Sequence, residues 1–112
     1  MGEKQTAKKN NASPLLLADL VQYAQDSVVS KTLLDKKTGT ITLFAFDKGQ
    51  KLSEHVSPYD AVINVIDGSA KITIGGKANS MSTGQIITMP ANIPHAVEAA
   101  ERFKMLLTMI RA

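Results

Sequence analysis

Short apolar segments alternate with turn residues from Ser27 to the end of the chain, at intervals of about ten residues. The segments are rich in Val, Ile and Thr, which favour β-strands. This pattern predicts an all-β fold in which a compact sheet of eight or nine antiparallel strands closes on itself. The predicted strands cover residues 28–34, 40–46, 51–55, 61–66, 70–74, 77–81, 85–89, 95–99 and 103–110.

Turn residues separate these strands. We expect turns at residues 35–39, at Asp67-Gly68 and at Gly75-Gly76, where the pair of glycines suits a type I′ hairpin. Within residues 40–46, both alternating sets of positions are largely apolar. That strand is therefore expected to pack against other residues on both of its faces.

The N-terminal part of the chain has a different pattern. Ser13 followed by Pro14 is typical of a helix start, and the apolar residues from Leu16 to Val21 recur at helical spacing, so a short helix is predicted there. Residues 1–13 hold three lysines and few apolar side chains, which predicts a disordered basic tail. Residues 14–112 are then expected to form a single domain, in keeping with a chain of 112 residues.

Charge and composition exclude several classes of protein. The net charge of +3 comes mostly from the tail, because the remaining 99 residues carry ten basic and nine acidic side chains. With two arginines and no basic stripe, we expect no nucleic-acid binding. The absence of cysteine excludes disulfides, thiolate metal sites and a thiol nucleophile. No apolar run is long enough for a signal peptide or a membrane helix, which predicts a cytoplasmic protein without membrane contact.

The first of two glycine-bounded segments covers residues 49–68 and has the spacing G(X)5HXH(X)3E(X)6G. His55 occupies the first histidine position of this pattern. Ser57 stands at the second histidine position, and Ala61 stands at the glutamate position. Because alternate residues of a strand share a face, His55 and Ser57 are expected to point the same way.

The second segment covers residues 84–99 and has the spacing G(X)5PXG(X)2H(X)3N. His95 occupies its histidine position, Asn92 stands at the glycine and Ala99 stands at the asparagine. With both segments in this order, residues 27–111 resemble the small single-domain bacterial cupins of the cupin 2 type. The resemblance implies the double-stranded β-helix of that family, a jelly-roll barrel.

The resemblance also bears on metal binding. Metal-binding cupins hold a divalent ion with three histidines and a glutamate that point into the barrel, and here His55 and His95 are the only two of these four ligands present. Two neutral imidazoles supply no negative charge to offset the desolvation of a divalent ion. We therefore expect a barrel that holds either no cofactor or a weakly bound Fe, Mn, Zn or Ni ion. The two imidazoles are expected to lie close enough to share a water, an anion or such an ion.

Asp60 leaves one alternative open. It follows a Pro-Tyr pair and precedes Ala61, so its carboxylate either accepts backbone N–H groups in a turn or swings inward as a third metal ligand. A histidine is also more often a core or surface residue than a functional one. However, His55 and His95 are the only histidines of the chain and fall in separate motifs, so we expect both to line one cavity.

The cavity is expected to be largely apolar. Inward alternation places methionines and aliphatic residues on its walls, where methionine usually fills space and sulfur ligation is a minor alternative. The predicted lining consists of His55, Ser57, Asp60, Ile63, Met89, His95, Phe103, Met105 and Leu107.

Three functions remain compatible with these residues. The first is a binding protein for a small, partly apolar molecule or a weakly held metal in a cavity lined by His55 and His95. The second is a metal-dependent cupin enzyme of the dioxygenase or isomerase type that uses both histidines as ligands, or uses one of them as a general acid or base. The third is a structural or regulatory partner protein. Residues 40–46 and 103–110 have two apolar faces, which predicts a homodimer that covers the excess apolar surface.

Overall fold

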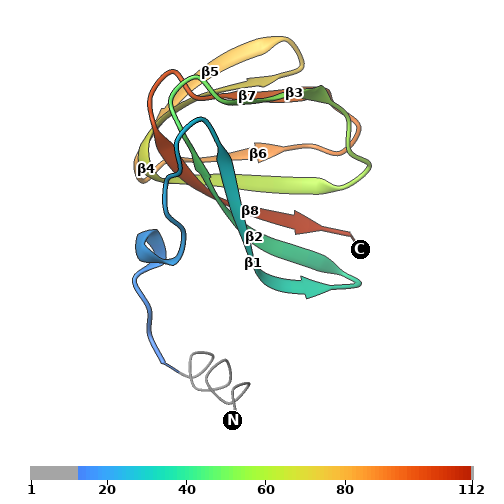
Figure 1. Cartoon of the computed structure of the whole chain (residues 1–112). Helices are drawn as coiled ribbons and strands as arrows, with labels where there is room; N and C mark the ends of the chain where they lie inside the picture. Colours follow the sequence, from blue (N-terminus) through green and yellow to red (C-terminus); the bar gives the residue numbers. More distant parts are fainter. Residues whose placement is uncertain (1–12, 112) are drawn as a thin grey trace.

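The computed structural model describes residues 13–111 and is an all-β barrel built from two facing layers (Figure 1). One layer has the strand order β1-β2-β8-β4-β6 and the other has the order β5-β4-β7-β3. All of the strand pairs are antiparallel. The strands are β1 (Val28–Lys36), β2 (Gly39–Phe46), β3 (Lys51–His55), β4 (Asp60–Ile74), β5 (Lys77–Ser82), β6 (Ile86–Met89), β7 (His95–Glu98) and β8 (Phe103–Ile110).

The two layers are joined by β4, which belongs to both of them. Its first half pairs with β6 and β8, and its second half pairs with β5 and β7. A bulge between Val65 and Asp67 and a positive φ of 77° at Gly68 bend the strand where it passes from one layer to the other (Figure 1). The predicted turn at Asp67-Gly68 is therefore wrong, because the strand continues through it. The hairpin at Gly75-Gly76 has positive φ at both glycines, as a type I′ turn requires.

The barrel core lies between the two layers. Alternate residues of β4 point into this core. Before the bulge the inward residues have odd numbers, and after it they have even numbers, because the bulge adds one residue to the strand. The inward residues are Ala61, Ile63 and Val65 before the bulge and Ala70 and Ile72 after it. The same core holds the stacked rings of β2 and β8 near the bend and the methionines of β5, β6 and β8.

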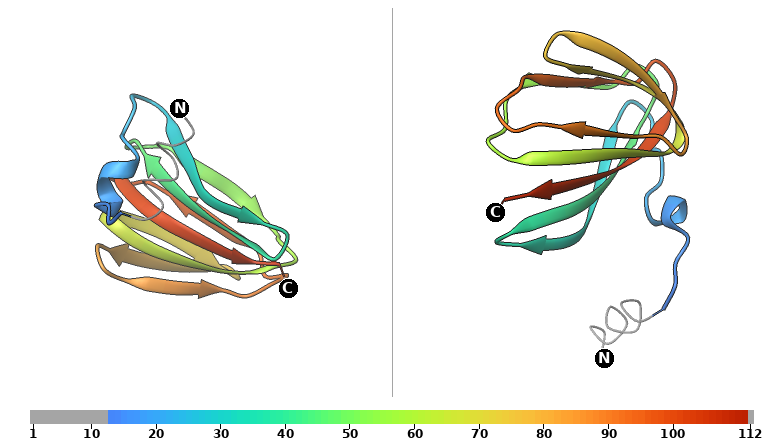
Figure 2. Two further views of the ribbon diagram at one scale, coloured as in Figure 1. Left: turned by 90° about the horizontal axis from the view of Figure 1, so that it is seen from below. Right: turned by 180° about the vertical axis from the view of Figure 1, so that it is seen from behind.

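The N-terminal segment packs outside the barrel. Its short element η1 (Leu17–Leu20) is a 3-10 helix preceded by Leu16, with no side-chain cap, so the predicted helix start at Ser13 and Pro14 is wrong. Val21 is buried with Leu43 and Ala45 on the outer face of β2. Figure 2 shows this segment outside the barrel in both views. The predicted tail lies, except for Ser13, outside the described residues, and no described helix is long and apolar enough to span a membrane.

Candidate functional site

Two histidines from neighbouring strands meet at one edge of the barrel. His55 ends β3 and His95 begins β7, and the two residues are directly paired. Their ring centroids lie 4.2 Å apart, with one ring edge-on to the other at 68°. This contact agrees with the expectation that the two motifs bring their histidines close together. A bulge in β3 between Leu52 and His55 sets this register, because Leu52 is paired with Val97.

Hydrogen bonds fix the proton on each imidazole. The Nδ1 atom of His55 lies 2.8 Å from the carbonyl oxygen of Ser53, and the Nδ1 atom of His95 lies 3.2 Å from that of Ile93. A carbonyl oxygen can only accept, so each Nδ1 carries the proton and donates it. In the neutral rings, both Nε2 atoms are therefore left as hydrogen-bond acceptors or metal ligands.

The two imidazoles differ in exposure. His95 is 6% exposed, whereas His55 is an exposed residue. On β4, the neighbour of His95 is Ile74, a partly buried residue that packs against the core. One imidazole of the pair is thus buried against the core, and the other is open to solvent.

Ser57 lies beyond the end of the strand from which its orientation was predicted. β3 ends at His55, and Ser57 lies in the connection to β4. Its hydroxyl oxygen accepts the backbone N–H of Tyr59 at 3.2 Å, and its carbonyl accepts the backbone N–H of Asn92 at 2.7 Å. The rule that alternate residues share a face holds only within a strand, so the orientation of Ser57 relative to His55 stays a prediction.

Asp60 adopts the first of the two alternatives. Its Oδ1 atom accepts the backbone N–H of Ala91 at 2.8 Å. Asp60 is exposed and pairs with Ile110, whereas the next residue, Ala61, is buried in the core. Because neighbouring residues of a strand point to opposite faces, the Asp60 carboxylate points away from the interior.

Both departures from the second motif have a structural reason. Asn92 has φ of 67°, a left-handed conformation that asparagine tolerates better than most residues other than glycine. Ala99 is buried in the core and exchanges backbone hydrogen bonds with the start of the first motif, from Gly49 at 2.7 Å and to Gln50 at 2.9 Å. The two motifs are thereby tied together beside β3 and β7.

The residues of the predicted apolar lining lie at different positions along the barrel. Met89 pairs with Ala61 near the start of β4, and Leu107 pairs with Ile63 two residues further on. Met105 follows, paired with Val65, and lies deeper along the same strand.

Phe103 is misplaced in the prediction. It pairs with Gly68 at the bend and stacks on Phe46 with ring centroids 4.5 Å apart. His95 pairs with Ile74, six residues along β4 from that bend. Phe103 is therefore a core residue near the bend of β4. The alternation pattern could not show this, because it predicts the face of the sheet on which a residue lies but not its position along the barrel.

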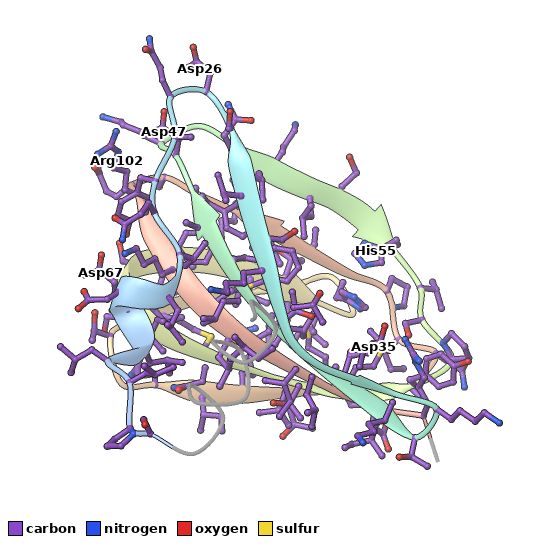
Figure 3. All side chains as sticks on the ribbon, turned by 60° about the horizontal axis from the view of Figure 1, so that its bottom comes forward. Asp26, Asp35, Asp47, His55, Asp67 and Arg102 are labelled. Atoms are coloured by element: carbon purple, nitrogen blue, oxygen red, sulfur yellow. The ribbon has the colours of Figure 1, made fainter. Side chains whose placement is uncertain are left out.

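A charged cluster that the sequence analysis missed lies away from His55 (Figure 3). Asp47 accepts hydrogen bonds from Arg102 Nε at 2.8 Å and from the backbone N–H of Asp26 at 2.7 Å, and these bonds lower the pKa of its carboxyl. Tyr23 donates to Asp67 at 2.6 Å, and burial, followed by this bond, raises the pKa of its phenol. The partners are 21 to 55 residues apart in sequence, and no local motif marks them.

A second set of contacts holds the N-terminal segment against this cluster. The guanidinium of Arg102 lies 5.1 Å from the centre of the Tyr23 ring, and the ammonium of Lys104 lies 5.0 Å from it. Lys104 is buried and donates to the carbonyl of Ala18 at 2.6 Å. We assign the whole cluster a structural role, because its polar groups are paired with one another.

The donor set does not fit a tightly held divalent ion. A catalytic site of that kind normally has three protein ligands, and one of them is often a carboxylate. Among residues 13–111, no group of three His, Cys, Asp or Glu side chains is placed to hold a metal. His55 and His95 supply two neutral nitrogens, Ala61 supplies no ligand, and the Asp60 carboxylate points away.

Comparisons with known proteins agree with this architecture. Residues 42–110 match the family described as Cupin domain. A solved protein of unknown function from Streptococcus pyogenes is 42% identical with a TM-score of 0.86, and the alignment covers 90% of this chain and 89% of that one. A cupin superfamily protein from Desulfitobacterium hafniense is 30% identical with a TM-score of 0.84, covering 88% and 90%. An uncharacterised protein from Streptomyces coelicolor is 29% identical over 62 residues, which span 55% of this chain and 59% of that protein.

Proposed function

Because the chain belongs to the cupin family, we propose that it is a small-molecule-binding cupin in which His55 and His95 hold the polar group of a partly apolar ligand. The observation that carries this proposal is the state of the two imidazoles. Both Nδ1 atoms donate to backbone carbonyls, and the rings lie 4.2 Å apart, which leaves two Nε2 acceptors on adjacent rings.

This arrangement selects a hydrogen-bond donor. Two neutral acceptors take a hydroxyl or an amide N–H and offer nothing to an ether or a ketone. An unpaired donor or acceptor in a desolvated site costs about 1–3 kcal/mol, so the pair discriminates by hydrogen bonding more than by shape. The apolar part of the ligand lies against the core residues beside the pair, Leu52, Ile74 and Val97.

The proposal is tested with phenol and anisole, which share a ring but differ in the donor. The chain has two histidines, so a protein labelled with 15N-histidine gives two imidazoles to follow by NMR. Phenol is expected to shift the Nε2 resonances of both rings with an affinity on the order of millimolar, as suits so small a ligand. Anisole is expected to leave them unchanged.

The matched variants separate binding from folding. His55 is exposed, so His55→Ala is expected to keep the fold and to abolish the response of His95 to phenol. Ser57→Ala is the control, because the Ser57 hydroxyl is engaged with Tyr59, and phenol binding should persist in it. Equal shifts with phenol and anisole, or an unchanged response in His55→Ala, would contradict the proposal.

A further inference from the structure

Two thioethers flank the position that the family pattern fills with a carboxylate. Ala61 of β4 is paired with Met89 of β6 on one side and with Met109 of β8 on the other. Directly paired residues share one face of a sheet, and Ala61 is buried in the core. Both methionines therefore face the barrel interior. Met89 is itself 4% exposed, and Met109 is half-buried.

These methionines and the histidine pair lie at the same end of the barrel. Met89 ends β6 and His95 begins β7, with five residues between them. Ala61 lies seven residues before the bend at Gly68, and Ile74, the partner of His95, lies six residues after it, so both are at the end of the barrel away from the bend. Facing sheets pack about 10 Å apart. An imidazole that extends from one layer and a thioether that extends from the other can therefore meet between them.

We propose that His55, His95, Met89 and Met109 form a binding site for a soft monovalent metal ion, namely cuprous copper. The proposal deepens the function proposed above, on which it rests, by naming a second class of ligand for the histidine pair. Thioether sulfur is a soft donor that selects Cu(I), and imidazole also binds copper. With Ala61 at the carboxylate position, the hard donor is absent between the two methionines.

Charge favours a monovalent ion over a divalent one at this position. All four donors are neutral, and no described acidic residue joins the pair in a metal-binding group. The cost of removing an ion from water rises steeply with its charge, so neutral ligands compensate one positive charge far better than two. The neutrality of the four donors is thus the reason why the site suits Cu(I) and does not suit a divalent ion.

The test is an anaerobic titration of the full chain with Cu(I) in competition with bicinchoninate. We expect one high-affinity ion per chain, with sulfur among the nearest neighbours of copper in X-ray absorption. Met89→Leu combined with Met109→Leu keeps the volume of the core and removes both sulfur atoms. The affinity should fall at least about tenfold, since loss of groups that merely support a metal ligand already costs 10–100-fold. Met81→Leu is the control, because Met81 is equally buried but pairs with Ala70 near the bend.

Several results would overturn the proposal. These are an absence of Cu(I) binding in the wild type, copper without sulfur neighbours, or equal affinity in the double variant and in Met81→Leu. The wild type is also titrated with phenol in the absence of copper. A normal phenol response beside a failed copper titration would reject the copper site alone, whereas a missing phenol response would reject the binding role of the histidine pair.

Discussion

Because residue 61 is an alanine and not a glutamate, the histidine site has no carboxylate at this position. Ala61 is buried among methionines, and the nearest acidic residue along the chain, Asp60, is held outward by the backbone N–H of Ala91. The site is therefore neutral when its imidazoles are neutral. Neutral acceptors suit hydrogen-bond donors and soft ions, and they are poor partners for a hard divalent ion.

Returning a carboxylate to this residue should reverse that preference. Ala61→Glu adds a third ligand, so we expect it to bind Zn²⁺ or Ni²⁺ much more tightly than the wild type. Without metal it should be less stable by about 1–3 kcal/mol, because a charged group enters the core unpaired. Thermal unfolding with and without each metal measures both effects. Ala61→Gln is the matched control, and a metal-induced rise in Tm equal to that of Ala61→Glu would show that the charge is not the cause.

The Asp47 carboxylate makes the stability of the fold depend on pH in the acidic range. The hydrogen bond from Arg102, followed by that from the backbone of Asp26, lowers the pKa of its carboxyl in the fold below the ordinary value of 3.8. A group of this kind stabilises the fold above its unfolded pKa, and the contribution is lost as pH falls through the lower folded pKa. Asp47→Asn should therefore lower Tm at pH 7, and its Tm should converge with that of the wild type only as the pH falls below 3.8 and through the lower pKa of the folded state.

The control for this effect is Asp35→Asn. The Asp35 side chain is 67% exposed and lies 3.7 Å from Arg111, so it forms a surface ion pair of little consequence. Its Tm should follow that of the wild type throughout a titration from pH 7 to pH 2.5. A constant difference between Asp47→Asn and the wild type over that range would contradict the role assigned to the carboxylate.

Among the strands, β4 depends on one glycine for its passage between layers. Gly68 has φ of 77°, and a Cβ atom there would overlap the backbone oxygen of Arg102, whereas Gly84 has φ of 93° with open space around it. Both alanine variants carry backbone strain, but only Gly68→Ala adds a steric clash. We expect Gly68→Ala to lose about 1–3 kcal/mol more than Gly84→Ala in urea unfolding. Equal losses would mean that the close approach to β8 is relieved without cost.

The same glycine marks a limit of sequence-based prediction. The sequence pattern located the strands but divided β4 into two, and alternation placed Ala61 and Ile63 on the inward face of β4. It failed at Gly68, because a turn and a bend within a strand both use a positive φ, and only the pairing of Gly68 with Phe103 on β8 tells them apart.

At the site, the sequence is more informative for residues inside strands than for residues at or beyond a strand end. The motif spacing brought His55 and His95 together, since each lies at a fixed position in a paired strand. Ser57 lies beyond the end of β3, so strand alternation does not place its side chain. The two alternatives for Asp60 could not be separated because its carboxylate accepts the backbone N–H of Ala91, which is 31 residues away, and one sequence does not contain such a tertiary contact.

Over the whole molecule, the outer face of the β1-β2-β8-β4-β6 layer is only partly covered. The N-terminal segment buries Leu43 and Ala45 at one part of it. Elsewhere on this face, Leu34, Ile86 and Ile110 are 48%, 67% and 49% exposed, and a groove of about 190 Å³ lies between the β1–β2 hairpin and the end of β8. An apolar face of this kind is characteristic of an interface between protein chains.

We expect this face to be covered by a second copy of the chain, related by a two-fold axis so that each β1–β2 hairpin lies against the same face of its partner. Light scattering should return about 24 kDa, twice the 12.0 kDa of one chain, at tens of micromolar. Leu34→Asp combined with Ile110→Asp should give a folded monomer, because paired carboxylates at a two-fold interface repel and cannot be solvated there. Val56→Asp, at a residue 56% exposed in the β3–β4 connection, should remain dimeric. A wild-type mass near 12 kDa would refute the dimer, and a double variant that stays dimeric would place the interface on another face.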